Sequence, residues 1–304
     1  MQIKKRSLMG LSILISSAVI SGILLGTIYL NFFYKKPTDY SKYTQSNLRD
    51  NEKAIMAQYG NSDITTLTGI NAFIIAEHKS REQQTVTIKA DGAINTLIKQ
   101  SLYTTRYLDF ARGMYYVENI SKGTKIMGIN SNIAERNYYD DQSGMVSVYQ
   151  GRNVRETSAD FDMNKPNKTV TLADWENING TTPLSFQPYI VSTKTVQSVT
   201  APTACVLDNG NNGYVFQLSL NFKAAILYVK QMKNLSGLPE YPSFESIKLE
   251  VHLNEDGTFH KIACDEKYYV NMGFGSIDTV SKLTYHFTYN DDILFPNIDT
   301  GEGE

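Results

Sequence analysis

The chain has 304 residues and a formal net charge of −2, and 41% of its residues are hydrophobic. Five basic and no acidic residues lie among the first 36, so the remainder carries 24 basic and 31 acidic residues, a net charge of −7. This acidic remainder argues against nucleic acid as a partner and against electrostatic docking on anionic lipid. The four histidines and two cysteines lack the spacing of a zinc or haem motif, so the sequence predicts no metal and no other cofactor.

An uncharged, largely apolar stretch of 28 residues runs from Ser7 to Tyr34, directly after the basic residues Lys4–Arg6. Roughly 20 apolar helical residues span a bilayer core, so this stretch is long enough for a transmembrane helix. The alternative is a leader cleaved near Ser16–Ala18, but apolar residues continue from Val19 to Phe33, which a leader does not need. We therefore predict that residues 1–36 form a basic end and an uncleaved signal-anchor.

The flanking charges predict the orientation of this anchor. Basic residues favour the cytoplasmic side, and they are more numerous on the N-terminal flank than on the C-terminal one. We expect a single-pass cell-membrane protein with a cytoplasmic N-terminus and an extracytoplasmic, extracellular body. Ala18, Gly22 and Gly26 are four residues apart and form a candidate helix-packing face for a dimer, although small residues are frequent in any membrane helix.

The rest of the chain divides into a polar linker at 37–43, an α+β domain at 44–292 and an acidic flexible tail at 293–304. The domain begins with a predicted helix at 44–59, whose apolar residues recur at helical spacing before Gly60. Short runs of strand-forming residues follow, separated by turn residues, and they predict an antiparallel meander. The predicted strands cover 70–78, 84–90, 100–110, 113–120, 124–130 and 144–151.

The segment 151–170 is polar and irregular, and we expect it to act as a flap over a binding site. A short helix follows at 171–179, with Thr171 as its N-cap and Gly180 as its end. After a strand at 213–220, the apolar residues of 222–234 lie on one helical face and predict a helix packed on the sheet.

Residues 247–269 predict a hairpin with Asp256-Gly257 as a two-residue turn. This register pairs Leu249 with Cys264 and Val251 with Ile262 on the core face, and it pairs Lys248 with Asp265 and His252 with Lys261 on the opposite face. It also separates His252 from His260, so these histidines are not expected to share a metal. A last strand is predicted at 280–290.

No sequence motif indicates catalysis, and we expect a non-enzymatic protein. Adjacent acidic residues lie in predicted turns, and adjacent tyrosines lie in predicted strands, where turn chemistry and sheet packing account for them. The cysteines Cys205 and Cys264 either form one disulfide or remain two buried thiols, and the sequence leaves both alternatives open.

The order of elements and the final hairpin "KLEVHLNEDGTFHKIACDEKY" resemble the LolA/LppX-like superfamily of bacterial envelope domains over roughly residues 45–290. This resemblance implies a curved antiparallel sheet, or half-barrel, that helices close around an apolar cavity. It also implies a lipid or acyl-chain ligand or an envelope protein partner. The hairpin residues expected to line the cavity are Leu249, Val251, Leu253 and Ile262.

The chain departs from that superfamily because it has no lipobox cysteine and carries a fixed anchor. A tethered domain cannot carry cargo across a compartment, so we expect local ligand binding or partner binding instead. The alternatives are a structural or sensory ectodomain with a filled core and no ligand, and an unrecognised hydrolase.

Overall fold

A computed structural model describes residues 34–96, 99–123, 132–140, 142–180, 182, 185–186, 188–236, 238–272, 275–293 and 295. The predicted membrane anchor, including Ala18, Gly22 and Gly26, lies outside the described residues, as do the predicted strand at 124–130 and most of the predicted tail. Among the helices that the structure does describe, none has the length and apolar character needed to cross a bilayer.

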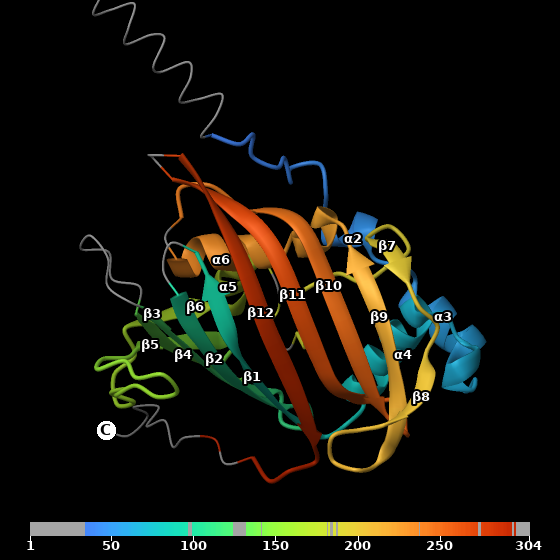
Figure 1. Cartoon of the computed structure of the whole chain (residues 1–304). Coiled ribbons are helices and arrows are strands. Elements are labelled where there is room, and N and C mark those ends of the chain that lie inside the picture. Colours follow the sequence, from blue (N-terminus) through green and yellow to red (C-terminus); the bar gives the residue numbers. More distant parts are fainter. Residues whose placement is uncertain are drawn as a thin grey trace, which may run out of the picture.

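The described residues form a sheet-dominated α+β fold around one open, antiparallel sheet of twelve strands (Figure 1). The strand order is β6-β5-β4-β3-β2-β1-β12-β11-β10-β9-β7, and β8 pairs with β9 beside β7. The strands are β1 (Thr85–Asn95), β2 (Lys99–Asp109), β3 (Met114–Gly123), β4 (Ile133–Asp140), β5 (Met145–Gln150), β6 (Lys168–Thr171), β7 (Val196–Val199), β8 (Thr203–Val206), β9 (Asn212–Leu220), β10 (Ser243–Asn254), β11 (Phe259–Met272) and β12 (Gly275–Tyr289). The first and last strands of the meander therefore meet in the middle of the sheet, where β1 pairs with β12.

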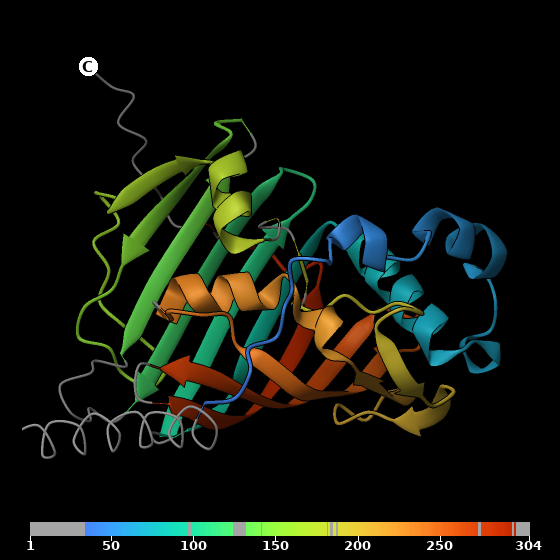
Figure 2. The ribbon, with the colours of Figure 1, turned by 90° about the horizontal axis from the view of Figure 1, so that it is seen from above.

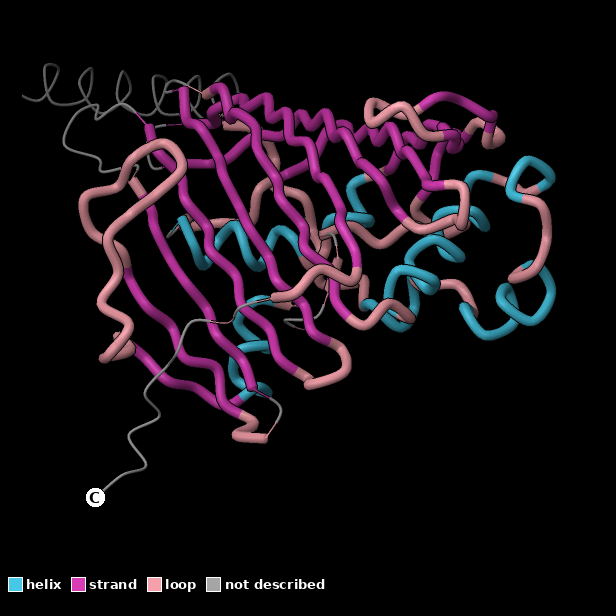
Figure 3. Tube along the Cα trace, turned by 90° about the horizontal axis from the view of Figure 1, so that it is seen from below, coloured by secondary structure: helices cyan, strands magenta, loops and turns pink. Residues whose placement is uncertain are grey.

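Helices cover one face of the sheet, which we call the inner face (Figures 2 and 3). The described helices are α2 (Gln45–Leu48), α3 (Glu52–Tyr59), η1 (Ile64–Thr66), α4 (Gly69–Arg81), α5 (Leu172–Asn179), η2 (Phe222–Ala225) and α6 (Tyr228–Ser236). Strand register aligns Val251, Ile262, Tyr285 and Ala90 in one row across four strands on this face. All four belong to the same buried hydrophobic cluster as residues of α4, α5, η2 and α6, so the core lies between the sheet and the helices.

The predicted helix at 171–179 is confirmed, together with both of its caps. The Thr171 hydroxyl accepts a hydrogen bond from the Asp174 backbone N–H at 3.1 Å, which satisfies one free donor of the first turn. Gly180 ends the helix at φ 71°, in the left-handed region that glycine adopts without a Cβ clash.

The predicted strand at 70–78 is wrong, because this segment belongs to helix α4. Ala72, Phe73, Ile75 and Ala76 have helical spacing and are buried, and the Phe73 ring lies 5.1 Å from the Phe259 ring of β11. The Thr68 hydroxyl accepts a hydrogen bond from a first-turn N–H, as an N-cap does. A short apolar run has no clear period, so the sequence pattern alone does not separate a buried helix from a buried strand.

Two other predicted helices are divided. The helix predicted at 44–59 separates into α2 and α3 at Arg49–Asn51, where the Asp50 carboxylate accepts hydrogen bonds from the Thr193 backbone and side chain, both at 2.7 Å. The helix predicted at 222–234 begins as the 3₁₀ turn η2 and continues as α6. Strand β4 was not among the predicted strands.

The predicted hairpin register is confirmed at the pairs Leu249–Cys264, Val251–Ile262, His252–Lys261 and Lys248–Asp265. The predicted two-residue turn is wrong, because the register shifts after His252 and Leu253 pairs with Phe259. The Asn254 N–H donates to the Thr258 carbonyl at 2.9 Å, which closes a longer turn with Gly257 at φ 87°. Asp256 holds this turn by accepting from the Thr258 N–H at 2.8 Å.

The segment predicted as a linker packs against the domain. Tyr40 is buried, and its hydroxyl donates to the Pro242 carbonyl at 2.9 Å and accepts from the Phe244 N–H at 3.4 Å. The Lys35 ammonium pairs with Glu245 at 3.1 Å and with Asp278. Residues 34–40 therefore lie along one end of β10, β11 and β12.

Candidate functional site

The four hairpin residues predicted to line a cavity lie in the packed core. Leu249, Val251, Leu253 and Ile262 are between 0% and 2% exposed and belong to the hydrophobic cluster beneath the helices. None of them borders the interior pocket described below. Their side chains contribute to stability, and whether a ligand displaces the helices above them stays a prediction.

The two cysteines are free thiols, which excludes the disulfide alternative. Cys205 lies on β8 and Cys264 on β11, and strands β9 and β10 separate them in the sheet. Neighbouring strands are about 4.8 Å apart, so this separation far exceeds the Cα–Cα distance of about 7 Å that a disulfide tolerates. Only Cys264 is buried, whereas Cys205 is partly exposed.

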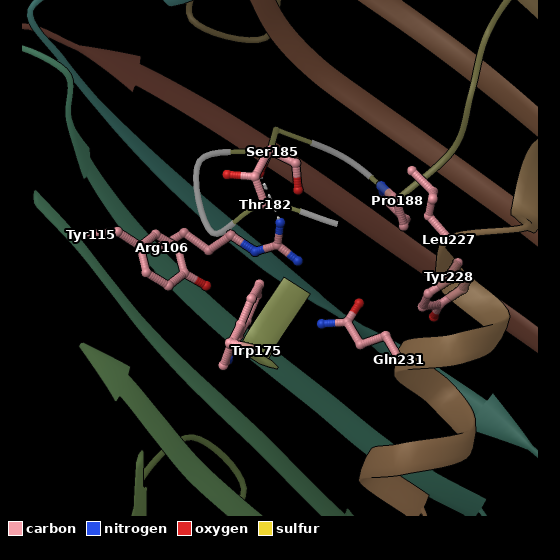
Figure 4. Close-up of a pocket in the computed structure, with 9 residues that line it drawn as sticks. All are labelled: Arg106, Tyr115, Trp175, Thr182, Ser185, Pro188, Leu227, Tyr228 and Gln231. Atoms are coloured by element: carbon pink, nitrogen blue, oxygen red, sulfur yellow. Dashed lines mark hydrogen bonds between the residues drawn. The ribbon is translucent and has the colours of Figure 1, made fainter. Parts of the chain in front are cut away.

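A pocket opens on the inner face, between the sheet and the helices that cover it (Figure 4). Arg106 of β2 and Tyr115 of β3 form its floor, and Trp175 of α5 and Tyr228 and Gln231 of α6 form its walls. Ser185 and Pro188 lie on another side. The volume is about 10 Å³, which is about the space of one water molecule.

Arg106 lies in this interior because of its position on β2. Its register neighbours are Ile88 of β1 and Val117 of β3, and both are buried in the core cluster. Side chains two residues apart on a strand share a face, so the buried Leu108 confirms that Arg106 points to the inner face. The guanidinium therefore projects from the sheet into the pocket, as Figure 4 shows.

The Arg106 guanidinium has few hydrogen-bond partners. One terminal nitrogen donates to the Ser185 carbonyl at 3.2 Å, and the buried Nε has no partner among the described residues. No ion pair between described residues includes Arg106. By contrast, Arg112 pairs with Asp109 and Arg136 pairs with Glu118, each at 2.5 Å. Arg106 is thus a cation that faces an aromatic interior without a described counter-ion.

The hydroxyl groups of the pocket stay neutral. Burial raises the pKa of Tyr115 and the pKa of Tyr228 well above the usual range of a phenol. Neither phenol supplies a negative charge to Arg106 at physiological pH. The Gln231 amide extends from α6 toward the same space and offers a further neutral hydrogen-bonding group (Figure 4).

Buried carboxyl groups nearby do not neutralise Arg106 either. Glu266 of β11 is 1% exposed, and burial raises its pKa to about 8, so it is mostly protonated at neutral pH. Glu135 is partly buried, which raises its pKa above the usual range, and its carboxylate accepts from the Asn137 amide at 2.8 Å and forms no described ion pair with Arg106. Neither carboxyl lies within ion-pair distance of Arg106.

Glu266 belongs to a second group of polar atoms on the inner face. Glu266 Oε2, Thr279 Oγ1 and Ser281 Oγ are buried and have no hydrogen-bond partner among the described residues. Glu266 and Ser281 are register partners on β11 and β12. Nearly all buried polar groups in folded proteins are paired, so the inner face contains more unpaired polar groups than a finished apolar core would.

The segment 151–170, expected to be a flap, lies elsewhere. The Phe161 ring stacks 4.0 Å from the Arg136 guanidinium, and Arg136 also lies over the Tyr116 ring. Arg136 alternates with the buried, inward-facing Asn137, so this packing is on the outer face of β3 and β4. None of the residues that line the interior pocket comes from this segment.

A larger depression of about 470 Å³ lies on the outer face over β9–β12. It contains a row of alternating charges in which Lys282 pairs with Asp265 at 3.3 Å. Lys282 and Asp265 are exposed and paired with each other, and no described buried polar side chain without a partner borders the depression. We therefore regard the inner-face pocket as the candidate site.

The pocket combines one cation with aromatic walls, which suits binding better than catalysis. No described nucleophile lies beside a base in the pocket, and no described cluster of three or more His, Cys, Asp or Glu side chains is arranged for a metal. The two hairpin histidines have separate partners, since His252 contacts Glu250 and His260 contacts Asp208.

Sequence reasoning missed Arg106, although a signal was present. In "QSLYTTRYLDF" the residues Leu102, Thr104, Arg106 and Leu108 alternate along one face, which predicts an arginine among core-facing side chains. The chain matches no protein-family model, and no curated protein matches it significantly. The functional argument therefore depends on the residues of this site.

Proposed function

We propose that the body of this protein is a non-catalytic, extracytoplasmic binding domain that takes an amphipathic ligand on the inner face of its sheet. In this proposal the apolar N-terminal stretch tethers the domain to the membrane, and the sheet acts as a half-barrel closed by α4, α5 and α6. The observation that carries the proposal is the set of unpaired polar atoms, from Arg106 to Glu266, within an otherwise apolar and aromatic interior.

Ligand binding requires the cover to move. The pocket holds about one water, and the apolar residues around it are packed, so an acyl chain needs space now filled by α6. Each methylene that leaves water contributes about 0.8 kcal/mol, which offsets the contacts that the cover gives up. The resemblance to the LolA/LppX-like superfamily supports a lipid or acyl chain as the apolar part of the ligand.

Native mass spectrometry of the full-length chain, purified from membranes in detergent, tests this proposal. We expect a bound molecule of lipid-like mass that is released on unfolding. As a matched measurement, the protein is unfolded and extracted with organic solvent, and mass spectrometry of the extract should detect the same molecule. If no molecule co-purifies and added fatty acid shows no saturable binding, the proposal is wrong.

The second candidate is a structural or sensory ectodomain without a ligand. Its support is the burial of Leu249, Val251, Leu253 and Ile262 in the hydrophobic core cluster, where none of the four lines the inner-face pocket. The same experiment separates the two candidates, because an ectodomain with a finished core binds no lipid.

A further inference from the structure

We infer that the ligand carries a carboxylate head group and that Arg106 binds it inside the inner-face pocket. This inference rests on the proposed function and specifies the chemistry of the ligand. It follows from the charge, the free hydrogen-bond donors and the size of the pocket.

The positive charge of Arg106 favours the binding of an anion in the pocket. Arg106 is partly buried, and a cation that is withdrawn from water without a partner loses part of its solvation. Arg106 has no described counter-ion, and its surroundings are the rings of Trp175, Tyr115 and Tyr228. An anion that enters this pocket therefore forms a strong, poorly screened ion pair and removes the cost of the isolated cation.

The free N–H groups of the Arg106 guanidinium favour a planar anion. One Arg106 nitrogen donates to the Ser185 carbonyl, while Nε and the remaining N–H groups of the fork have no hydrogen-bond partner among the described residues. A guanidinium binds a carboxylate through two parallel hydrogen bonds, and this geometry matches a planar group with two oxygens. The Gln231 amide, which extends toward the same space, can hydrogen-bond the bound head group.

Size and charge balance favour a carboxylate over a phosphate. The closed pocket holds about one water, so any head group enters only when the cover moves, and a planar carboxylate requires a smaller movement than a bulkier phosphate. A phosphate monoester also carries close to two negative charges near pH 7. A single arginine would leave one of those charges uncompensated, whereas a carboxylate is neutralised completely.

The chain contains its own reporter for this site. Trp175 is the one tryptophan of the sequence, it is 6% exposed, and it lines the pocket beside Arg106. Bromine quenches tryptophan emission only at short range, so a brominated ligand quenches the full-length protein only when it binds near Trp175. The probe is octadecanoate with two bromines in the half of its chain nearer the carboxylate, and the full-length protein is kept in a non-fluorescent detergent.

We expect saturable quenching by this acid and at least tenfold weaker binding in Arg106→Gln, which removes the charge. Arg106→Lys should bind with intermediate affinity, because it keeps the charge but loses the fork. Arg155→Gln is the matched control, since Arg155 is exposed, pairs with Asp160 and does not line the pocket. The alcohol with the same chain and bromines should quench at least tenfold more weakly than the acid.

Thermal unfolding verifies that the variants fold. Unliganded Arg106→Gln should be at least as stable as the wild type, because it lacks the uncompensated cation. Added octadecanoate should raise the midpoint of the wild type and of Arg155→Gln but not that of Arg106→Gln.

Three outcomes distinguish a failure of the carboxylate site from a failure of lipid binding. Equal quenching by acid and alcohol, or equal quenching of wild type and a folded Arg106→Gln, disproves the carboxylate site but leaves lipid binding intact. Displacement of the probe by butyrate at equal concentration supports Arg106 as a carboxylate site but disproves the lipid as its source. No quenching by either long-chain probe, with no co-purifying lipid, disproves both.

Discussion

Glu266 on β11 faces Ser281 on β12 across the inner face, and each residue is 1% exposed. The two side chains are close enough to interact, but Glu266 Oε2 and Ser281 Oγ form no hydrogen bond of normal geometry with a described residue. A carboxyl group in such a place is stable when it is neutral and unstable when it is charged. This relationship makes the stability of the fold depend on pH.

Glu266 should make the protein less stable as pH rises. Burial raises its pKa from 4.5 to about 8, so the folded state holds the proton more tightly than the unfolded chain does. The contribution of Glu266 to stability is therefore most favourable below pH 4.5, falls between pH 4.5 and about 8, and levels off above that window. We expect Glu266→Gln to abolish this decline and to be more stable than the wild type at pH 8, by a few kcal/mol, on the order of 1.4 per pKa unit.

Urea unfolding of the full-length protein across this pH range measures the effect. Glu250→Gln is the control, because the hydrogen bond from His252 lowers the pKa of Glu250 and gives it the opposite linkage. A wild-type profile that matches Glu266→Gln at every pH would contradict a buried, protonated Glu266.

The hairpin register predicts different effects at adjacent positions. Val251 is 0% exposed and pairs with Ile262 and Phe216, so Val251→Asp buries a carboxylate and should cost several kcal/mol. His252 points to the outer face and contacts Glu250 at 2.9 Å. His252→Asp loses this contact and should cost about 1 kcal/mol or less. Denaturant unfolding compares the two, and equal destabilisation would mean that the assigned faces are wrong.

The thiols should differ in reactivity. Cys205 is partly exposed, whereas Cys264 is buried, and burial raises the pKa of both thiols. We expect a maleimide to modify Cys205 in the folded protein and Cys264 only after unfolding, as measured by mass spectrometry. Two modified cysteines should appear in denaturant without any reductant. A chain that needs reductant before it reacts would contain the disulfide that the sheet topology excludes.

Tyr40 should anchor the N-terminal segment to β10. Its hydroxyl bridges the Pro242 carbonyl and the Phe244 N–H, so Tyr40→Phe leaves two buried backbone groups without this partner. We expect a loss of about 1–3 kcal/mol in the free energy of unfolding. Tyr43→Phe is the control, because its ring packs on Phe222 at 5.7 Å and no described hydrogen bond uses its hydroxyl. Equal losses in the free energy of unfolding for the two substitutions would show that the Tyr40 hydrogen bonds do not stabilise the fold.

Local sequence patterns were enough to predict two elements in detail. In the hairpin, alternation of apolar and polar residues on both strands allows only one register, because a shift of one residue would turn the apolar set outward. In α5, Thr171 and Gly180 mark both ends by short-range chemistry. Each of these signals lies within a few residues of the structure that it specifies.

The turn between β10 and β11 shows where such local reasoning stops. Asp256-Gly257 predicts a two-residue turn, but the Asp256 carboxylate bonds to the Thr258 N–H and hydroxyl and favours a longer turn. The pairing is preserved beyond the turn because the burial of Val251 and Ile262 outweighs the choice of turn type.

The sequence by itself determined an α+β chain with an antiparallel meander, the faces of the final hairpin and the position of α5, because periodicity and capping act over short distances along the chain. Only the tertiary structure decided that 70–78 is a helix, since Phe73 becomes buried there against Phe259, which is distant in sequence. The candidate site is a tertiary property for the same reason. Arg106 comes from β2, Trp175 from α5 and Tyr228 from α6, and the isolation of the arginine depends on which carboxyl groups the folded chain keeps away from it.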